Sequence, residues 1–154
     1  MGTAAESIHV ETPLTEVWDL YFDPAGWPRW VDGFRAVEAS DGYPEVGGTL
    51  RWRSTRAGRG TVTERVLEHR PPSMHRIAFS DPESEGELVT TFEVEAGPDG
   101  TEGARVTQET TYQVRGAGPL TRLTDPIFIR PQVGRSLRRS LEQLRMEAEG
   151  PSGR

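Results

Sequence analysis

The amino-acid sequence predicts an α+β fold in which a curved antiparallel sheet wraps around one long helix and leaves space between them. Three observations predict it. A short strand at residues 6–11 is followed by two short helical stretches, at 13–22 and 24–31. A run of β-type segments then extends from about residue 34 to residue 115. One long amphipathic helix, at 130–149, closes the chain.

The N-terminal elements follow from local patterns. Apolar and polar residues alternate over 7–11, which is typical of a half-buried strand. Thr12 is expected to cap the next helix, with Pro13 at its first position. Trp27 and Trp30 are three residues apart, so they share one face of the second helical stretch. The first helix has an apolar stripe made of Leu14, Val17, Trp18 and Tyr21.

Turn residues divide the β region into consecutive strands with short connections, which predicts an antiparallel meander. The signals are Asp41-Gly42, Gly47-Gly48, a hairpin at 57–60, Pro71-Pro72, a polar loop at 81–86 and a turn at 97–100.

The C-terminal helix has an apolar stripe that suits packing on the sheet: Val133, Leu137, Leu141, Leu144 and Ala148. An irregular apolar segment at 120–129 precedes it, and Phe128 and Ile129 are expected to line or gate an entrance.

Composition favours a partly hollow domain. The 154 residues are expected to form one domain over 1–150, with a disordered tail at 151–154. Only 34% of residues are hydrophobic, which fits a core lined by a few large aromatic rings better than a solid one. The net charge of -6 disfavours nucleic acids and anionic membranes as general partners.

Several classes of chemistry are excluded by missing residue types. The chain has no cysteine and no lysine, which excludes thiolate nucleophiles, disulfides and lysine Schiff bases. No pair of histidines has metal-ligand spacing, and no glycine cluster forms a phosphate loop, so neither a metal nor another cofactor is expected. No apolar stretch is long enough for membrane insertion, and no signal peptide precedes the first strand, so the cytoplasm is the expected compartment.

The chain resembles the START-like (SRPBCC) superfamily, and most closely its polyketide cyclase/dehydrase and lipid-transport branch. The resemblance is carried by residues 8–18, Asp23-Pro24 and the Trp27–Trp30 spacing. Residues 66–79 resemble the strand–proline–strand passage of this group, and 98–106 resemble the turn into its last strand. The similarity extends over residues 7–149.

This resemblance implies a helix-grip fold: a seven-stranded antiparallel sheet curved around the C-terminal helix, with two short helices after the first strand and a deep cavity. Members bind lipids, polyketides, hormones or other hydrophobic molecules, and some catalyse cyclisation or dehydration. Since the group has no short catalytic signature, the resemblance transfers no catalytic residue to this chain.

Aromatic residues are the first candidates for ligand contact. Trp27, Trp30 and Trp52 offer flat surfaces for stacking, although each could instead fill the core. Phe79 and Phe92 share strand parity with inward-facing residues and are predicted to contact the ligand, as is Phe128.

Glu64 is the most informative carboxylate. It shares strand parity with Val62 and Val66, which predicts that it points into the apolar interior. Burial would raise its pKa and suit it to general acid or base catalysis. A register slip of one residue would instead place it in water.

Polar residues on two other strands complete the candidates. Gln108, Thr110 and Tyr112 form an inward-facing ladder that could bond ligand oxygens, or could pair with one another or with buried water. Tyr112 could also donate a proton to an enolate. His75 shares parity with Phe79 and could reach the cavity.

Three functional hypotheses follow. The leading one is binding of a small hydrophobic ligand in an internal cavity. The second is polyketide cyclase or dehydratase chemistry, in which Glu64, His75 or Tyr112 moves protons during aldol closure and loss of water. The third is a protein-interaction module in which Arg51, Arg53 and their neighbours contact an acyl-carrier protein or another acidic partner. These arginines could equally lie on a solvated face, where they pair with glutamates on neighbouring strands. A homodimer is a further possible partner arrangement.

Overall fold

The structure, a computed structural model, describes residues 1–56, 59–115 and 130–150. Its elements are β1 (Gly2–Val10), α1 (Leu14–Tyr21), η1 (Pro24–Gly26), α2 (Trp27–Trp30), β2 (Phe34–Asp41), β3 (Thr49–Ser54), β4 (Thr61–Arg70), β5 (Met74–Ser80), β6 (Ser84–Val94), β7 (Ala104–Val114) and α4 (Arg130–Glu149). The predicted gate residues Phe128 and Ile129 and the predicted tail at 151–154 lie outside the described residues.

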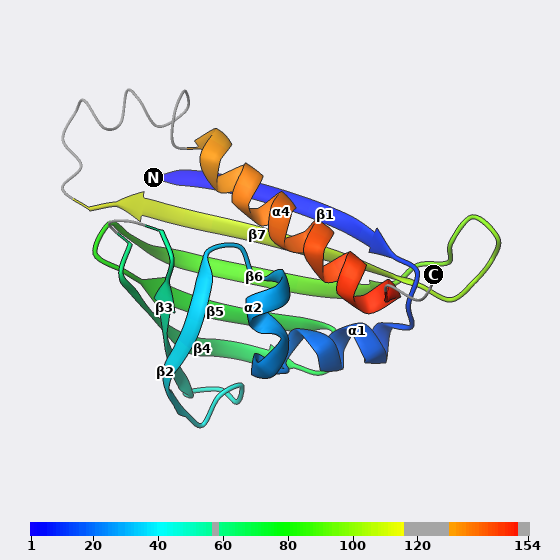
Figure 1. Ribbon diagram of the computed structural model, residues 1–154, viewed down its shortest axis with the longest axis horizontal. Helices are drawn as coiled ribbons and strands as arrows, with labels where there is room; N and C mark the ends of the chain where they lie inside the picture. Colours follow the sequence, from blue (N-terminus) through cyan, green and yellow to red (C-terminus); the bar gives the residue numbers. More distant parts are fainter. Residues whose placement is uncertain (57–58, 116–129, 151–154) are drawn as a thin grey trace.

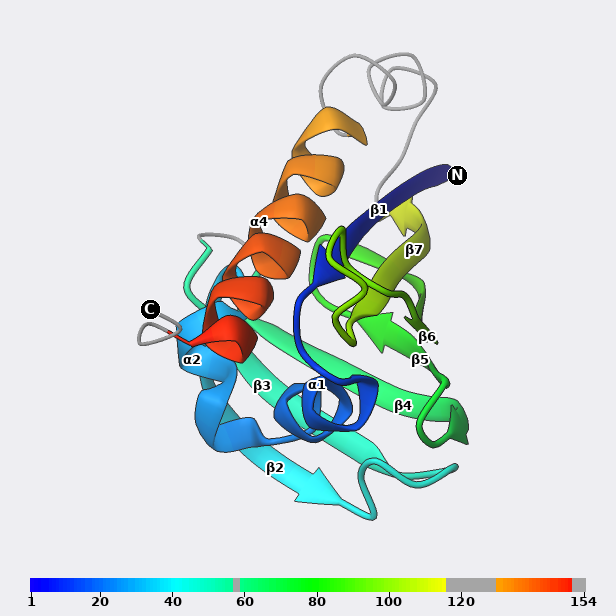
Figure 2. The ribbon, with the colours of Figure 1, turned by 90° about the vertical axis from the view of Figure 1, so that its right-hand side faces the viewer.

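The described strands form one seven-stranded sheet in the order β1-β7-β6-β5-β4-β3-β2, and every neighbouring pair is antiparallel. The sheet curves, and α4 lies along its concave side beside β1, with α1 and α2 on the same side (Figures 1 and 2). This confirms the predicted α+β helix-grip fold. Among the described helices, none has the length and apolar character needed to cross a bilayer.

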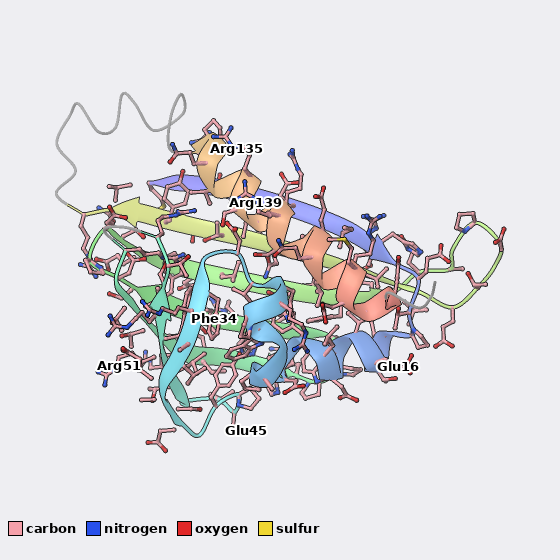
Figure 3. The ribbon with its side chains drawn as sticks, in the orientation of Figure 1. Glu16, Phe34, Glu45, Arg51, Arg135 and Arg139 are labelled. Carbon is pink, nitrogen blue, oxygen red and sulfur yellow. The ribbon has the colours of Figure 1, made fainter. Side chains whose placement is uncertain are left out.

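Alternation along the strands separates a concave, buried face from a solvated one. In β7, residues from Ala104 to Tyr112 are buried at every second position, as the period-2 pattern predicts. The core gathers where α1 and α4 meet the sheet, and Val17, Leu141 and Leu144 are 0–1% exposed there. Charged side chains such as Arg51, Arg135 and Arg139 cover the outside (Figure 3).

Three local predictions were wrong. The side chain of Thr12 makes no helix cap; instead its hydroxyl donates to the carbonyl oxygen of Ala148, 3.1 Å away, and ties the start of α1 to the end of α4. The polar loop predicted at 81–86 is shorter, because β6 already begins at Ser84 and includes Gly86. The first strand also begins earlier than predicted, at Gly2, since it pairs with β7 along its whole length.

The α2–β2 connection is fastened to α4 through Asp32. Its backbone N–H donates to the hydroxyl of Ser140, and its carboxylate accepts from the hydroxyl of Ser136, both over 2.8 Å. Arg139 donates to the same carboxylate over 3.2 Å. These bonds hold one wall of the interior at a fixed distance from the helix.

Replacing Ser140 with alanine is expected to lower the free energy of unfolding by about 1–3 kcal/mol, because the N–H of Asp32 loses its buried acceptor. Urea unfolding measures the change. Glu142→Ala, at an exposed position one residue beyond Leu141, is the matched control and should change stability by less than about 0.5 kcal/mol. Equal effects of both substitutions would show that the Asp32–Ser140 bond adds no stability.

Candidate functional site

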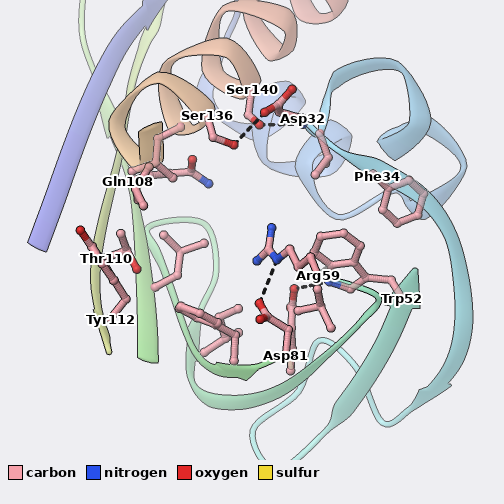
Figure 4. A pocket seen from close by; sticks show the side chains of 18 of the residues that line it. Asp32, Phe34, Trp52, Arg59, Asp81, Gln108, Thr110, Tyr112, Ser136 and Ser140 are labelled. Atoms are coloured by element: carbon pink, nitrogen blue, oxygen red, sulfur yellow. Dashed lines mark hydrogen bonds and ion pairs between the residues drawn. The ribbon is translucent and has the colours of Figure 1, made fainter. Parts of the chain in front are cut away.

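A cavity of about 410 Å³ lies between the concave face of the sheet and α4 (Figure 4). Strands β3 to β7 supply its floor, α4 covers it, and the α1–β2 region closes one side. Aromatic rings make up much of the wall: Tyr21, Trp27, Trp30, Phe34, Tyr43, Trp52, Phe79 and Tyr112.

Two carboxylates of the cavity lining, those of Asp32 and Asp81, are each paired with an arginine. Asp32 accepts from Ser136 and Arg139 on α4. Asp81 has no exposed side-chain surface, and its Oδ2 accepts from Nε of Arg59 over 2.9 Å. The guanidinium of Arg59 also lies 5.3 Å from the ring centre of Trp52, a cation–π distance. The charge of each of these two carboxylates is therefore balanced by an arginine.

Among the carboxylates of the cavity lining, Glu64 on β4 is the best suited to proton transfer. Nε1 of Trp52 donates to its Oε2 over 2.8 Å, and the side chain lines the cavity. Burial raises the pKa of Glu64 to about 7, against the opposing effects of the Trp52 hydrogen bond and the charge of Arg59. Near neutral pH this carboxyl group is therefore present in both forms and is able either to accept or to donate a proton.

A hydrogen-bonded polar group joins the end of α1 to β6 and β7. The hydroxyls of Tyr21 and Thr90 are 2.8 Å apart, and Nε2 of Gln108 donates to Tyr21 Oη over 3.1 Å. Burial raises the pKa of Tyr21 to about 12, so its hydroxyl keeps its proton. Gln108 uses its amide N–H here, while its Oε1 has no partner among the described residues. The group is thus a network with spare hydrogen-bonding capacity.

His75 lines the same cavity and is 3% exposed. Its Nδ1 lies 3.0 Å from Nδ1 of His69 on the neighbouring strand. Burial, and then the charge of His69, lowers the pKa of His75 to about 3, so the imidazole is neutral at physiological pH. The Nε2 atom of His75 is buried and has no hydrogen-bond partner in the described part of the chain. The same is true of Nε1 of Trp30 and of Oε1 of Gln108.

Most residues selected from the sequence meet in this one cavity. Its lining includes Trp27, Trp30, Trp52, Glu64, His75, Phe79, Gln108, Thr110 and Tyr112. The hydroxyl proton of Thr110 is already used, since it donates to the carbonyl oxygen of Glu87 over 2.8 Å.

Phe92 is the exception among the described candidates, because it is absent from the lining. Its ring packs edge-on against Trp18 and Tyr21, with ring centres 4.9 and 5.2 Å away. Strand parity correctly pointed it inwards, but α1 covers it, so it belongs to the core.

Several lining residues are not found by the sequence analysis. Tyr21 belongs to the apolar stripe predicted for α1, and Tyr43 lies in the β2–β3 connection, where no periodicity applies. From the sequence, Arg59 is predicted only as one of the neighbours of Arg51 and Arg53 in the surface patch. Trp52 lies on the strand that leads into the hairpin of Arg59. This closeness in sequence is the one signal that could have predicted that Arg59 faces the cavity.

Arg51 and Arg53, which were considered for partner binding, are paired on the outer face of the sheet. Arg53 donates to the carboxylate of Glu38 through Nη2 over 2.6 Å, and Arg51 lies 3.9 Å from the same group. Among the described residues, no three His, Asp or Glu side chains are grouped to hold a metal ion.

Comparison with known proteins agrees with this architecture. A family described as polyketide cyclase/dehydrase and lipid transport matches residues 1–149. No curated protein matches the chain. Among solved structures, the Zhui aromatase/cyclase from Streptomyces sp. R1128 is 16% identical, with a TM-score of 0.78 over 99% of this chain and 98% of that one.

Two further structures share the fold. A conserved protein from Geobacillus kaustophilus is 15% identical, with a TM-score of 0.69 over 96% of this chain and 95% of that one. A protein from Thermus thermophilus is 16% identical, with a TM-score of 0.68 over 94% of each chain. At these identities the structures establish the fold alone. The family match extends over nearly the whole sequence, so the chain belongs to the polyketide cyclase/dehydrase and lipid transport family.

Proposed function

We propose that this protein binds a small, mainly apolar organic ligand in its internal cavity. The observation that carries the proposal is the 410 Å³ cavity with a largely aromatic wall. Its volume falls in the range of roughly 300–1,000 Å³ that is common for small-molecule sites. The family's description, which includes lipid transport and polyketide cyclisation, supports the same role.

The wall also indicates the chemistry of the ligand. Flat rings such as Trp30 and Trp52 favour a planar or ring-forming molecule. The network of Tyr21, Thr90 and Gln108 suits ketone or hydroxyl oxygens, because it contains both donors and acceptors. A ligand with an apolar body and a few oxygens, as in an aromatic polyketide, satisfies both features.

Filling the cavity tests the proposal. Leu88 lines the cavity from β6, and its neighbour Val89, equally half-buried, lies outside the lining. Leu88→Trp is expected to weaken binding of the fluorescent probe N-phenyl-1-naphthylamine at least about tenfold, since the new ring occupies ligand space. The matched control Val89→Trp adds the same ring to the opposite face and should leave the affinity within about twofold. Equal losses in both variants, or no binding to the original protein, would contradict an internal site.

One observation favours catalysis as a second candidate function: Glu64 has a pKa of about 7 inside an aromatic-walled cavity. In an intramolecular aldol reaction, the carboxylate would remove a proton from the carbon next to one carbonyl group. The resulting enolate carbon would attack a second carbonyl, whose oxygen takes up a proton. Loss of one water then leaves a cyclic enone.

A simple diketone measures this activity. Heptane-2,6-dione contains both carbonyls in one chain, and its cyclisation yields 3-methylcyclohex-2-enone and one water. The protein is expected to accelerate formation of the enone, followed by its ultraviolet absorbance, with a rate that changes as Glu64 titrates near pH 7. If the protein binds the fluorescent probe but does not accelerate enone formation, the catalytic function is contradicted and the binding function still stands.

A further inference from the structure

We propose that Tyr112 limits the size of the ligand, and that it does so because Gly2 lets its ring lie over β1. This inference rests on the proposed binding function and adds a determinant of selectivity to it. Tyr112 is 4% exposed and lines the cavity from β7. It is seen on the β1 side of the cavity in Figure 4.

The strand register places glycine on both sides of this tyrosine. Tyr112 is opposite Gly2 of β1 and opposite Gly86 of β6. A Cβ atom added to Gly2 would collide with Cζ of the Tyr112 ring and lie 2.8 Å from its Cε2, closer than real Cβ contacts. The far end of the ring therefore occupies the space where a side chain of residue 2 would stand.

Gly86 lies against the backbone at Tyr112 on the β6 side. A Cβ atom there would lie 2.8 Å from Cα of Tyr112 and would overlap the carbonyl oxygen of Thr111. The backbones of β6 and β7 thus approach closely where Tyr112 leaves the sheet. The ring itself lies over Gly2 of β1 and lines the cavity.

The ring is therefore sensitive to the size of the residue at position 2. The contact at Gly2 is with the end of a side chain, which moves more easily than backbone. A larger residue would push the ring off β1 and into the cavity, and would shorten the space for a guest without altering the polar network at Tyr21, Thr90 and Gln108.

Two probes of different size test this. Gly2→Val is expected to weaken binding of the four-ring 1-hydroxypyrene at least about tenfold while changing the affinity for the two-ring 2-naphthol less than about twofold. Ala5→Val, which introduces the same residue on the exposed face of β1, is the matched control and should change neither. Urea unfolding of each variant verifies that it is folded.

A double substitution separates the ring's effect from a general effect on the edge strand. In a Tyr112→Leu background, adding Gly2→Val should no longer reduce 1-hydroxypyrene binding, because no ring remains to be displaced. An equal loss in both backgrounds, or equal losses for the two probes, would overturn the inference while leaving binding intact. If neither probe binds the original protein, the proposed function fails, and this inference with it.

Discussion

Replacing Glu64 with glutamine is expected to raise the free energy of unfolding at pH 8 by about 3 kcal/mol and to leave it nearly unchanged at pH 4. The pKa of this carboxyl is 4.5 in the unfolded chain and about 7 in the folded protein. Between these values the folded protein holds a proton that the unfolded chain has released, so stability falls as the pH rises through this window. Glutamine carries no titrating proton and still accepts the hydrogen bond from Trp52.

His75 changes the free energy of unfolding with pH in the opposite direction to Glu64. The pH profile therefore tests both groups. Its pKa falls from 6.5 in the unfolded chain to about 3 on folding, so stability is lost as the pH decreases below 6.5. Between about pH 4.5 and 6.5 the effects of Glu64 and His75 cancel in the original protein. When either group is removed, the free energy of unfolding changes with pH by about 1.4 kcal/mol per pH unit, because the effect of the remaining group is no longer cancelled.

Urea unfolding from pH 4 to pH 8 measures these slopes. Relative to the original protein, Glu64→Gln should gain stability as the pH rises from 5 to 6.5, and His75→Asn should lose it. The lost packing of the imidazole shifts every point of the His75→Asn profile equally, so the comparison uses the slope alone. A Glu64→Gln profile parallel to that of the original protein would show that this carboxyl titrates as an ordinary exposed acid.

The same substitution is expected to have the largest effect on catalysis. Glu64→Gln should slow the conversion of heptane-2,6-dione by about 10²–10⁴-fold, the usual contribution of a positioned acid or base. It should also remove the change of rate near pH 7. The measurement is the initial rate of enone formation as a function of pH.

Glu68→Gln is the matched control for this reaction. Glu68 lies on the same strand but pairs with Arg76, 2.9 Å away, outside the cavity lining. Its removal should leave the rate within about twofold of the original, because it has no route to the substrate. A Glu64→Gln protein that keeps its full rate would assign the proton transfer to another group or to solvent.

Strand parity predicted the inward-facing polar residues because a strand has only two faces. Once Val62 and Val66 are taken as buried, Glu64 must share their side, and the same argument places Gln108 and Tyr112. Parity says nothing of what covers a strand from above. The side of the sheet predicted for Phe92 is therefore correct, but its ring packs against α1 and does not line the cavity.

Residues outside regular elements could not be placed in the same way. Tyr43 enters the cavity wall from a connection, and its position depends on contacts with Trp27 and His75 that no short-range pattern encodes. The sequence predicts Gly86 in a loop because glycine usually marks a turn. In the fold it serves close packing between two strands, a requirement that only the neighbouring strand reveals.

The sheet order has a consequence for when the cavity forms during synthesis. The first strand made, β1, pairs with the last, β7, and Arg138 of α4 then contacts Glu6 of β1 over 3.1 Å. A nascent chain thus lacks one wall and the roof of its chamber until β7 and α4 have left the ribosome. Products that end before α4 would be unable to retain a guest, so uptake would report only on chains that contain this helix.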